Sequence, residues 1–206
     1  MEGVFIDGER CIGCRHCEIA CAIEHSSGKQ FFLMLKEEPL SHPRIAVKPG
    51  INLLTFPNKC QHCDPAPCTE VCPTGAMQRD KKTGSVLVNS EKCISCGMCA
   101  MVCPHDAIEY RIVPGKGSAV AFKCDGCVVR RAEGREPACV EACVTGALIF
   151  GEINKIISER RTRRSVNLTR ELSGYTSQEI PANIIAFRKV QEKIAQFGIL
   201  PSGKEE

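Results

Sequence analysis

The sequence has few of the large side chains that fill an apolar core. It contains no Trp among 206 residues, and aromatic residues make up only 5% of the chain. Apolar residues reach 43%, so most of the apolar content comes from small or aliphatic side chains. We therefore expect a thin core, and we expect something besides the burial of side chains to contribute to the folding free energy.

Several segments that would indicate other classes of protein are also missing. Apolar runs such as 51–56 are much shorter than the roughly 18 residues that a membrane-spanning helix needs. Residues 1–10 hold neither an apolar signal region nor a twin-Arg motif, and the dinucleotide-binding pattern Gly-x-Gly-x-x-Gly does not occur. We predict a cytoplasmic protein without a transmembrane segment, held at a membrane only through a partner if at all.

Charge gives little indication of a nucleic-acid partner. The formal net charge is only +3. Five arginines gather near the C-terminal end, but no aromatic residues alternate with them as in many nucleic-acid sites. We expect no nucleic-acid partner.

Cysteine, in contrast, is abundant: sixteen residues fall into four blocks of four, with none left over. Blocks one and three share the spacing C-x2-C-x2-C-x3-C, block two has C-x2-C-x4-C-x3-C, and block four has C-x2-C-x11-C-x3-C. In a reducing compartment such thiols bind metal rather than form disulfides. The blocks are Cys11, Cys14, Cys17 and Cys21; Cys60, Cys63, Cys68 and Cys72; Cys93, Cys96, Cys99 and Cys103; Cys124, Cys127, Cys139 and Cys143.

This spacing suits a cubane of iron and sulfide. A C-x2-C loop lets two sulfurs bind neighbouring corners while backbone N–H groups point at the cluster, and Gly13 and Gly97 permit the close approach. The x3 gap is typical of the first turn of a helix that carries the fourth Cys toward a second cluster, as in bacterial two-cluster ferredoxins. Pro73 and Pro104 follow the fourth Cys of their blocks, as in those ferredoxins. The sequence therefore predicts four [4Fe–4S] clusters.

Other interpretations of the cysteines stay open at this point. C-x2-C pairs also build zinc ribbons, although zinc sites do not need the recurring x3 member. A disulfide framework and a purely structural role for one cluster are further alternatives. In each metal-bound case, binding would supply folding free energy, because ligand sites are rarely preformed in an unfolded chain.

Short strands and helices are predicted between and within the blocks. Strands are indicated over 44–47 and 52–56 around the Pro49-Gly50 turn, over 85–89 and over 147–150, with a hairpin over 107–113 and 118–123. Short helices are predicted over 17–24 and 139–143. His16, His62 and His105 lie beside cysteines, where they either tune a cluster or fill a partly exposed loop, and we favour the loop interpretation.

The predicted fold class is α+β, with two ferredoxin-like two-cluster units. Residues 1–150 form the four-cluster domain, with an outer unit of 1–30 plus 120–150, an inner unit of 57–113, and a β-rich insertion over 31–56. Residues 151–206 form a basic, mainly helical extension, with helices over 154–172 and 181–197. The extension either packs an apolar face on the domain or docks a partner.

Two segments carry a family resemblance. Residues 60–76, CQHCDPAPCTEVCPTGA, and Cys124-Asp125-Gly126-Cys127 with residues 137–143, PACVEAC, resemble the second and fourth motifs of the four-cluster electron-transfer subunits of dimethyl sulfoxide reductase, formate dehydrogenase and hydrogenase complexes. The resemblance covers about residues 3–150. Within that family, residues 11–26 look most like the ferredoxin-like partner of nickel carbon monoxide dehydrogenase.

The resemblance implies which thiols share a cluster. Each fourth Cys crosses to another block, and outer blocks pair with outer, inner with inner. The four implied sets are Cys11, Cys14 and Cys17 with Cys143; Cys124, Cys127 and Cys139 with Cys21; Cys60, Cys63 and Cys68 with Cys103; Cys93, Cys96 and Cys99 with Cys72.

The resemblance also implies a function without a catalytic site of its own. A catalytic dehydrogenase, carbon monoxide dehydrogenase as the first choice, would pass electrons through the chain to a hydrogenase or a flavin-dependent NAD(P) oxidoreductase. The alternatives are an obligate iron–sulfur subunit of a molybdenum or tungsten oxidoreductase or formate dehydrogenase complex, and a free ferredoxin that shuttles between enzymes.

Overall fold

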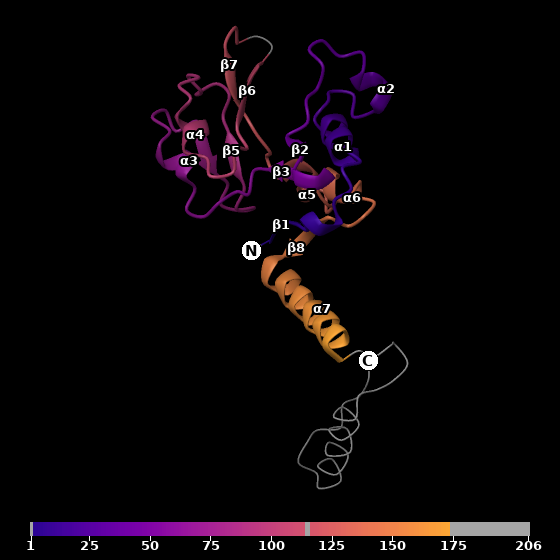
Figure 1. Ribbon diagram of the computed structural model, residues 1–206. Coiled ribbons are helices and arrows are strands. Elements are labelled where there is room, and N and C mark those ends of the chain that lie inside the picture. Colours follow the sequence, from indigo (N-terminus) through magenta and orange to yellow (C-terminus); the bar gives the residue numbers. More distant parts are fainter. Residues whose placement is uncertain (1, 114–115, 174–206) are drawn as a thin grey trace. The chain divides into compact units, whose positions relative to one another are not determined.

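A computed structural model (Figure 1) describes residues 2–113 and 116–173 of the chain. By its internal contacts the chain divides into two units, Met1–Ile153 and Asn154–Glu206. The helix predicted over 181–197 lies outside the described residues.

The first unit is built from small antiparallel sheets, four of them in its described part, each with two strands. Short helices lie between the strands. The pairs are β1 (Glu2–Ile6) with β8 (Leu148–Glu152), β2 (Ile45–Pro49) with β3 (Thr55–Lys59), β4 (Met77–Arg79) with β5 (Val86–Val88), and β6 (Glu109–Ile112) with β7 (Ala119–Phe122). The helices are α1 (His16–Glu24), α2 (Phe31–Met34), α3 (Pro67–Glu70), α4 (Met98–Met101), α5 (Val128–Ala132) and α6 (Ala138–Glu141), with 3-10 turns η1 (Gly8–Arg10) and η2 (Ile51–Leu53).

Most predicted elements are confirmed, and one strand is displaced. The predicted hairpin corresponds to β6 and β7, and α1 and α6 lie where helices were expected. The strand predicted over 52–56 is wrong by three residues, because β3 runs from Thr55 to Lys59. The turn lies after Pro49, where the Gly50 N–H donates to the Leu54 carbonyl at 2.6 Å and Asn52 adopts φ 52°. Asn tolerates this left-handed conformation, and Pro is accepted on the edge of a two-stranded sheet. The insertion also includes α2, so it is less purely β than predicted.

Two separate apolar clusters hold the first unit together, and both are built largely around cysteines. One contains buried Cys17, Cys21 and Cys139 with Ile45 and Leu148. The other contains Cys99 with Ala66, Met77, Val86, Ile108 and Ala121. Figure 1 shows α3, α4 and β5 to β7 in one part of the first unit and α1, α6, β1 and β8 in another. The second cluster comes from the former elements together with β4, and the first cluster comes from the latter together with β2.

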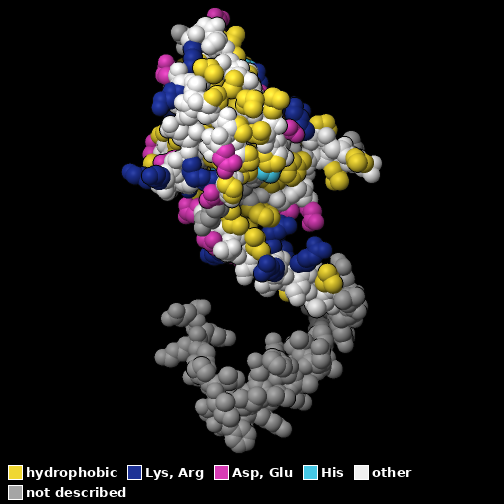
Figure 2. Space-filling view, turned by 90° about the vertical axis from the view of Figure 1, so that its left-hand side faces the viewer, with side chains coloured by type: hydrophobic (Ala, Val, Ile, Leu, Met, Phe, Trp, Pro, Cys, Tyr) yellow, Lys and Arg dark blue, Asp and Glu magenta, His cyan; other side chains and the backbone are white. Residues whose placement is uncertain are grey.

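The core is thin, as the composition predicts. Many large apolar side chains are exposed, among them Ile12, Phe32, Ile51 and Met101. Figure 2 shows hydrophobic side chains spread over the face that it presents, mixed with charged ones. Cysteines, alanines and valines make up much of what is buried.

The described part of the second unit is helical. Helix α7 (Ile153–Ser173) confirms the helix predicted over 154–172. It carries the predicted basic side chains, namely Arg160, Arg161, Arg163, Arg164 and Arg170. No helix among the described residues is long and apolar enough to cross a membrane. The predicted cytoplasmic location stays a prediction.

Candidate metal centres

All sixteen thiols of the chain are free, so the cysteines form no disulfides. Their exposure differs within each block. Cys14 and Cys96 are exposed, whereas the third Cys of blocks one and three, Cys17 and Cys99, is buried. In blocks one and three the chain thus passes from an exposed second Cys to a buried third Cys.

The first outer group joins block one to block four. Burial raises the pKa of Cys17 to about 11, and the neighbouring Glu18, Cys14 and Cys143 add to the rise. The structure therefore places Cys143, the last Cys of block four, beside block one. Cys11 packs against the same apolar cluster, and the Thr55 hydroxyl donates to its Sγ at 3.3 Å.

The second outer group joins the last Cys of block one to three cysteines of block four. Burial raises the pKa of Cys21 to about 12, the charges of Cys124 and Cys127 raise it further, and the Arg44 backbone N–H, 3.2 Å from Sγ, opposes them. Burial also raises the pKa of Cys139, followed by the charges of Cys124, Cys21 and Cys127. These four cysteines line a cavity of about 290 Å³. A thiol from block one therefore faces three thiols from block four.

The inner blocks approach each other in the same way. Burial raises the pKa of Cys68, and Cys60 and Cys103 contribute, so the last Cys of block three lies beside block two. Cys72, the last Cys of block two, lines a small cavity with block three. The other thiols that line this cavity are Cys93, Cys96 and Cys99. The Cys63 carbonyl accepts a hydrogen bond from the Arg79 guanidinium, which fixes the remaining loop of block two.

Backbone N–H groups point at several of the sulfurs. His62 N lies 3.5 Å from Cys60 Sγ, Gly126 N lies 3.4 Å from Cys124 Sγ, and Ala121 N lies 3.5 Å from Cys93 Sγ. Hydrogen bonds to the charged form favour a thiolate, which is the form that binds metal. Four groups of thiols with N–H donors around them suit [4Fe–4S] clusters.

The two Thr-Gly-Ala segments after blocks two and four behave alike. Burial raises the pKa of Cys72, but the Met77 backbone N–H and the Thr74 hydroxyl lower it more, so the net change is downward. Burial also raises the pKa of Cys143, but the Leu148 backbone N–H and the Thr145 hydroxyl lower it more, so its net change is downward as well. The same Thr-Gly-Ala sequence after the fourth Cys therefore gives blocks two and four the same local stabilisation of a thiolate.

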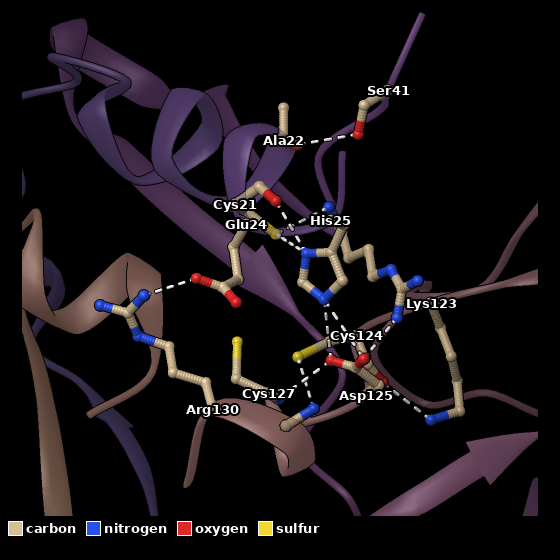
Figure 3. Close-up of polar contacts among 12 residues, drawn as sticks. Cys21, Ala22, Glu24, His25, Ser41, Lys123, Cys124, Asp125, Cys127 and Arg130 are labelled. Carbon is tan, nitrogen blue, oxygen red and sulfur yellow. Dashed lines mark hydrogen bonds and ion pairs between the residues drawn. The ribbon is translucent and has the colours of Figure 1, made fainter. Parts of the chain in front are cut away.

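A polar network that the sequence did not reveal ties block one to block four (Figure 3). His25 Nδ1 lies 2.7 Å from the Cys21 carbonyl, and its Nε2 lies 3.2 Å from both carboxylate oxygens of Asp125. Arg44 Nη1 lies 2.6 Å from Asp125 Oδ2. Burial raises the pKa of Asp125, but the His25 hydrogen bond and the Arg44 charge lower it well below its usual range. A carboxylate inside the Cys124–Cys127 loop thus holds the end of α1.

A buried arginine adds a second link between the same blocks. Arg130 pairs with Glu24 of α1 and with Glu141 of α6, and its Nε donates to the Glu136 carbonyl at 2.6 Å. Its side chain is 7% exposed. The residues that link α1 to block four are about a hundred positions apart in sequence, so no local spacing pattern could have predicted them.

One prediction about the histidines is confirmed only in part. His62 is partly exposed in a loop, as expected, but it is more than a filler, because its Nδ1 accepts a hydrogen bond from Val86 N at 2.9 Å. Burial, followed by the charges of Lys123 and Lys59, lowers the pKa of His62 to about 3, so the ring stays neutral. His62 therefore links block two to β5 as a neutral side chain, whereas His16 is exposed as expected.

Tyr110 is a further residue whose role the sequence did not indicate. Its hydroxyl lies 3.2 Å from Cys99 Sγ, in the small cavity shared by Cys72 and block three. Tyr110→Phe is expected to lower the midpoint potential of the cluster held there, since a lost hydrogen bond to sulfur disfavours the reduced, more negative state. A bond of ~1 kcal/mol corresponds to roughly 40 mV for one electron. Potentiometric titration followed by electron paramagnetic resonance measures the shift; an unchanged potential contradicts it.

Comparison with known proteins identifies the chemistry of these groups. The family described as "4Fe-4S dicluster domain" matches residues 51–153, which include blocks two, three and four. The protein belongs to this family. With sixteen cysteines in four groups, this 4Fe–4S dicluster family member carries four [4Fe–4S] clusters, which decides against zinc.

Curated relatives match most of the sequence. The electron transport protein HydN of Escherichia coli K12 is 40% identical over 175 residues, which are 79% of this chain and 95% of HydN. The probable anaerobic dimethyl sulfoxide reductase protein YnfG of the same strain is 36% identical over 80% of each sequence. The B subunit of the anaerobic dimethyl sulfoxide reductase of that strain is 37% identical over 75% of each sequence. This dicluster family member is therefore an iron–sulfur electron-transport protein of the same kind.

A solved structure aligns with this protein at low similarity. It belongs to the active site complex BamBC of benzoyl coenzyme A reductase, and it aligns over 91% of this chain and 97% of its own length. The identity is 20% and the TM-score 0.36, so the likeness carries no argument about function.

Proposed function

We propose that this chain relays single electrons between a catalytic oxidoreductase and an acceptor, and that it does so without a catalytic site of its own. The observation that carries the proposal is the convergence of thiols from different blocks into neighbouring groups, with Cys21 beside Cys124 and Cys127, and Cys124 in turn beside Cys60. A bound [4Fe–4S] cluster supplies one-electron redox chemistry. The residues of this chain hold such clusters next to one another and shield them.

The proposed ligand sets follow the crossed scheme. The proximity of Cys17 to Cys143, of Cys21 to Cys124, and of Cys68 to Cys103 supports it. Two such sets make an outer unit and two an inner unit, each around its own apolar cluster. The sets are Cys11, Cys14, Cys17 and Cys143; Cys21, Cys124, Cys127 and Cys139; Cys60, Cys63, Cys68 and Cys103; Cys72, Cys93, Cys96 and Cys99.

For the donor we propose carbon monoxide dehydrogenase, with a hydrogenase or a flavin-dependent NAD(P) oxidoreductase as acceptor. Support for this donor comes from the resemblance of residues 11–26 to its ferredoxin-like partner. The second candidate is an iron–sulfur subunit of a molybdenum or tungsten oxidoreductase. The names of two relatives, both subunits of dimethyl sulfoxide reductases, favour this second candidate.

A reduction assay separates the two candidates. The iron-loaded chain is mixed without oxygen with purified carbon monoxide dehydrogenase and carbon monoxide, and cluster bleaching is followed by visible absorption. We expect bleaching at catalytic amounts of dehydrogenase, and none with carbon monoxide alone. Absence of bleaching, together with co-purification of a molybdenum-containing subunit from the native cells, would establish the second candidate instead.

A further inference from the structure

Two buried lysines stand directly before cysteine blocks. Lys59 ends β3 and precedes Cys60, and Lys123 follows β7 and precedes Cys124. Each is only 4% exposed. Blocks one and three are also preceded by a basic residue, but Arg10 and Lys92 are exposed. Burial thus distinguishes the lysines before blocks two and four from their counterparts.

Both ammonium groups bond to backbone carbonyls rather than to acids. Lys59 Nζ donates to the Cys60 carbonyl at 3.1 Å, and Lys123 Nζ donates to the Cys124 carbonyl at 3.0 Å and to the Val86 carbonyl (Figure 3 shows Lys123). Within the part of the chain that the structure describes, neither lysine forms an ion pair with a carboxylate. A buried charge without an opposite charge is unfavourable. These two cations therefore need counter-charge from another source.

The counter-charge that each lysine faces belongs to the other block. Lys59 lines the cavity of about 290 Å³ together with Cys21, Cys124, Cys127 and Cys139, and its charge opposes the effect of burial on Cys124 and Cys139. Lys123 Nζ donates to the Val86 carbonyl, and Val86 belongs to the apolar cluster against which Cys68 and Cys103 pack, so Lys123 reaches the inner thiols. Its charge also opposes the effect of burial on the pKa of Cys68. The two lysines also line one small pocket, so they lie next to each other. Each lysine thus precedes one cysteine block and faces the thiols of the other block.

We propose that Lys59 and Lys123 are positioning residues that supply crossed positive charge to two neighbouring clusters, Lys59 to the set of Cys21, Cys124, Cys127 and Cys139, and Lys123 to the set of Cys60, Cys63, Cys68 and Cys103. The inference rests on the ligand sets given under Proposed function. A [4Fe–4S] core with four thiolates is anionic, and reduction adds one more negative charge. A fixed cation nearby stabilises the reduced form, and two of them offset the repulsion between adjacent reduced clusters.

The proposal is tested by replacing each lysine with Met, which removes the positive charge and changes the shape of the side chain little. Lys59→Met and Lys123→Met are made in the full chain, loaded with iron, and titrated potentiometrically with electron paramagnetic resonance detection. Each variant is expected to lower one midpoint potential, and the two variants are expected to lower different ones. We expect about a tenfold loss in the one-electron reduction constant, which is about 59 mV. Lys92→Met is the matched control, because Lys92 precedes block three but is exposed.

The following outcomes would overturn the proposed roles of the two lysines. Unchanged potentials, or equal shifts of one and the same cluster in both variants, overturn the crossed assignment. If Lys59→Met loses iron, Lys59→Gln, which keeps a donor for the Cys60 carbonyl, takes its place; iron loss in both means that the lysine acts in folding alone, and the proposal falls. A wild-type chain that holds its clusters but exchanges electrons with no partner contradicts the proposed function, without affecting the lysine result.

Discussion

Removing iron from the purified chain with a chelator, without oxygen, is expected to unfold the first unit. Its sheets have two strands each in the described part, and isolated two-stranded sheets are marginal in water. Both apolar clusters include cysteines as central members, so loss of the metal leaves Cys17, Cys21 and Cys99 as small, polar-tipped thiols in a thin core. Binding free energy then is folding free energy.

The measurement is far-ultraviolet circular dichroism with limited proteolysis. We expect the iron-free chain to lose the cooperative thermal transition of the loaded protein and to be cut rapidly within residues 2–153. A sample treated with the same chelator already saturated with iron serves as control. If the iron-free chain kept a cooperative transition at the same temperature, the burial of side chains alone would be enough to fold it.

The second large effect concerns which cysteines share a cluster. Cys21→Ala is expected to remove one cluster, about four irons. Because Cys21 lies beside Cys124 and Cys127, adding Cys124→Ala should cause no further loss, since both substitutions affect the same cluster. Adding Cys11→Ala instead should remove a second cluster, for a total of about eight irons. This non-additivity is the signature of a shared site.

Iron analysis and counting of reduced-cluster spins measure these losses. An uncrossed arrangement, in which each block holds its own cluster, predicts the reverse pattern: additive loss with Cys124→Ala and no added loss with Cys11→Ala. Cys143→Ala gives a matched test in the other direction, because Cys143 lies beside Cys17. The two patterns do not overlap, so one set of double variants decides between them.

The sequence was informative where chemistry is local. The spacing within blocks such as Cys11 to Cys21 predicted the loops and the short helices, because a cubane requires three sulfurs from a few consecutive residues. The hairpin at 107–123 was predictable because the Pro-Gly-Lys-Gly turn separates two runs of β-forming residues. Strand β1 was missed, because its pairing partner β8 is about 145 residues away and the sequence shows no sign of the pairing.

Contacts between residues far apart in the sequence could not be predicted from the sequence. The His25–Asp125 pair and the Arg130–Glu24 pair join α1 to block four across about a hundred residues. A lysine before a cysteine is also unremarkable in sequence, because burial alone separates Lys59 and Lys123 from Lys92. Local patterns predict which residues bind metal; tertiary contacts decide which charges surround the metal.

The pairing of β1 with β8 has a consequence for how the protein is made on the ribosome. Strand β1, Glu2–Ile6, finds its partner only after Leu148–Glu152 has been synthesised. Blocks two and three lie between these strands, and their residues pack in an apolar cluster of their own. The inner half can therefore mature while Cys11 to Cys21 wait as unprotected thiols. The residues that are synthesised first are thus the last to meet their neighbours in the fold, because those neighbours lie in block four and β8.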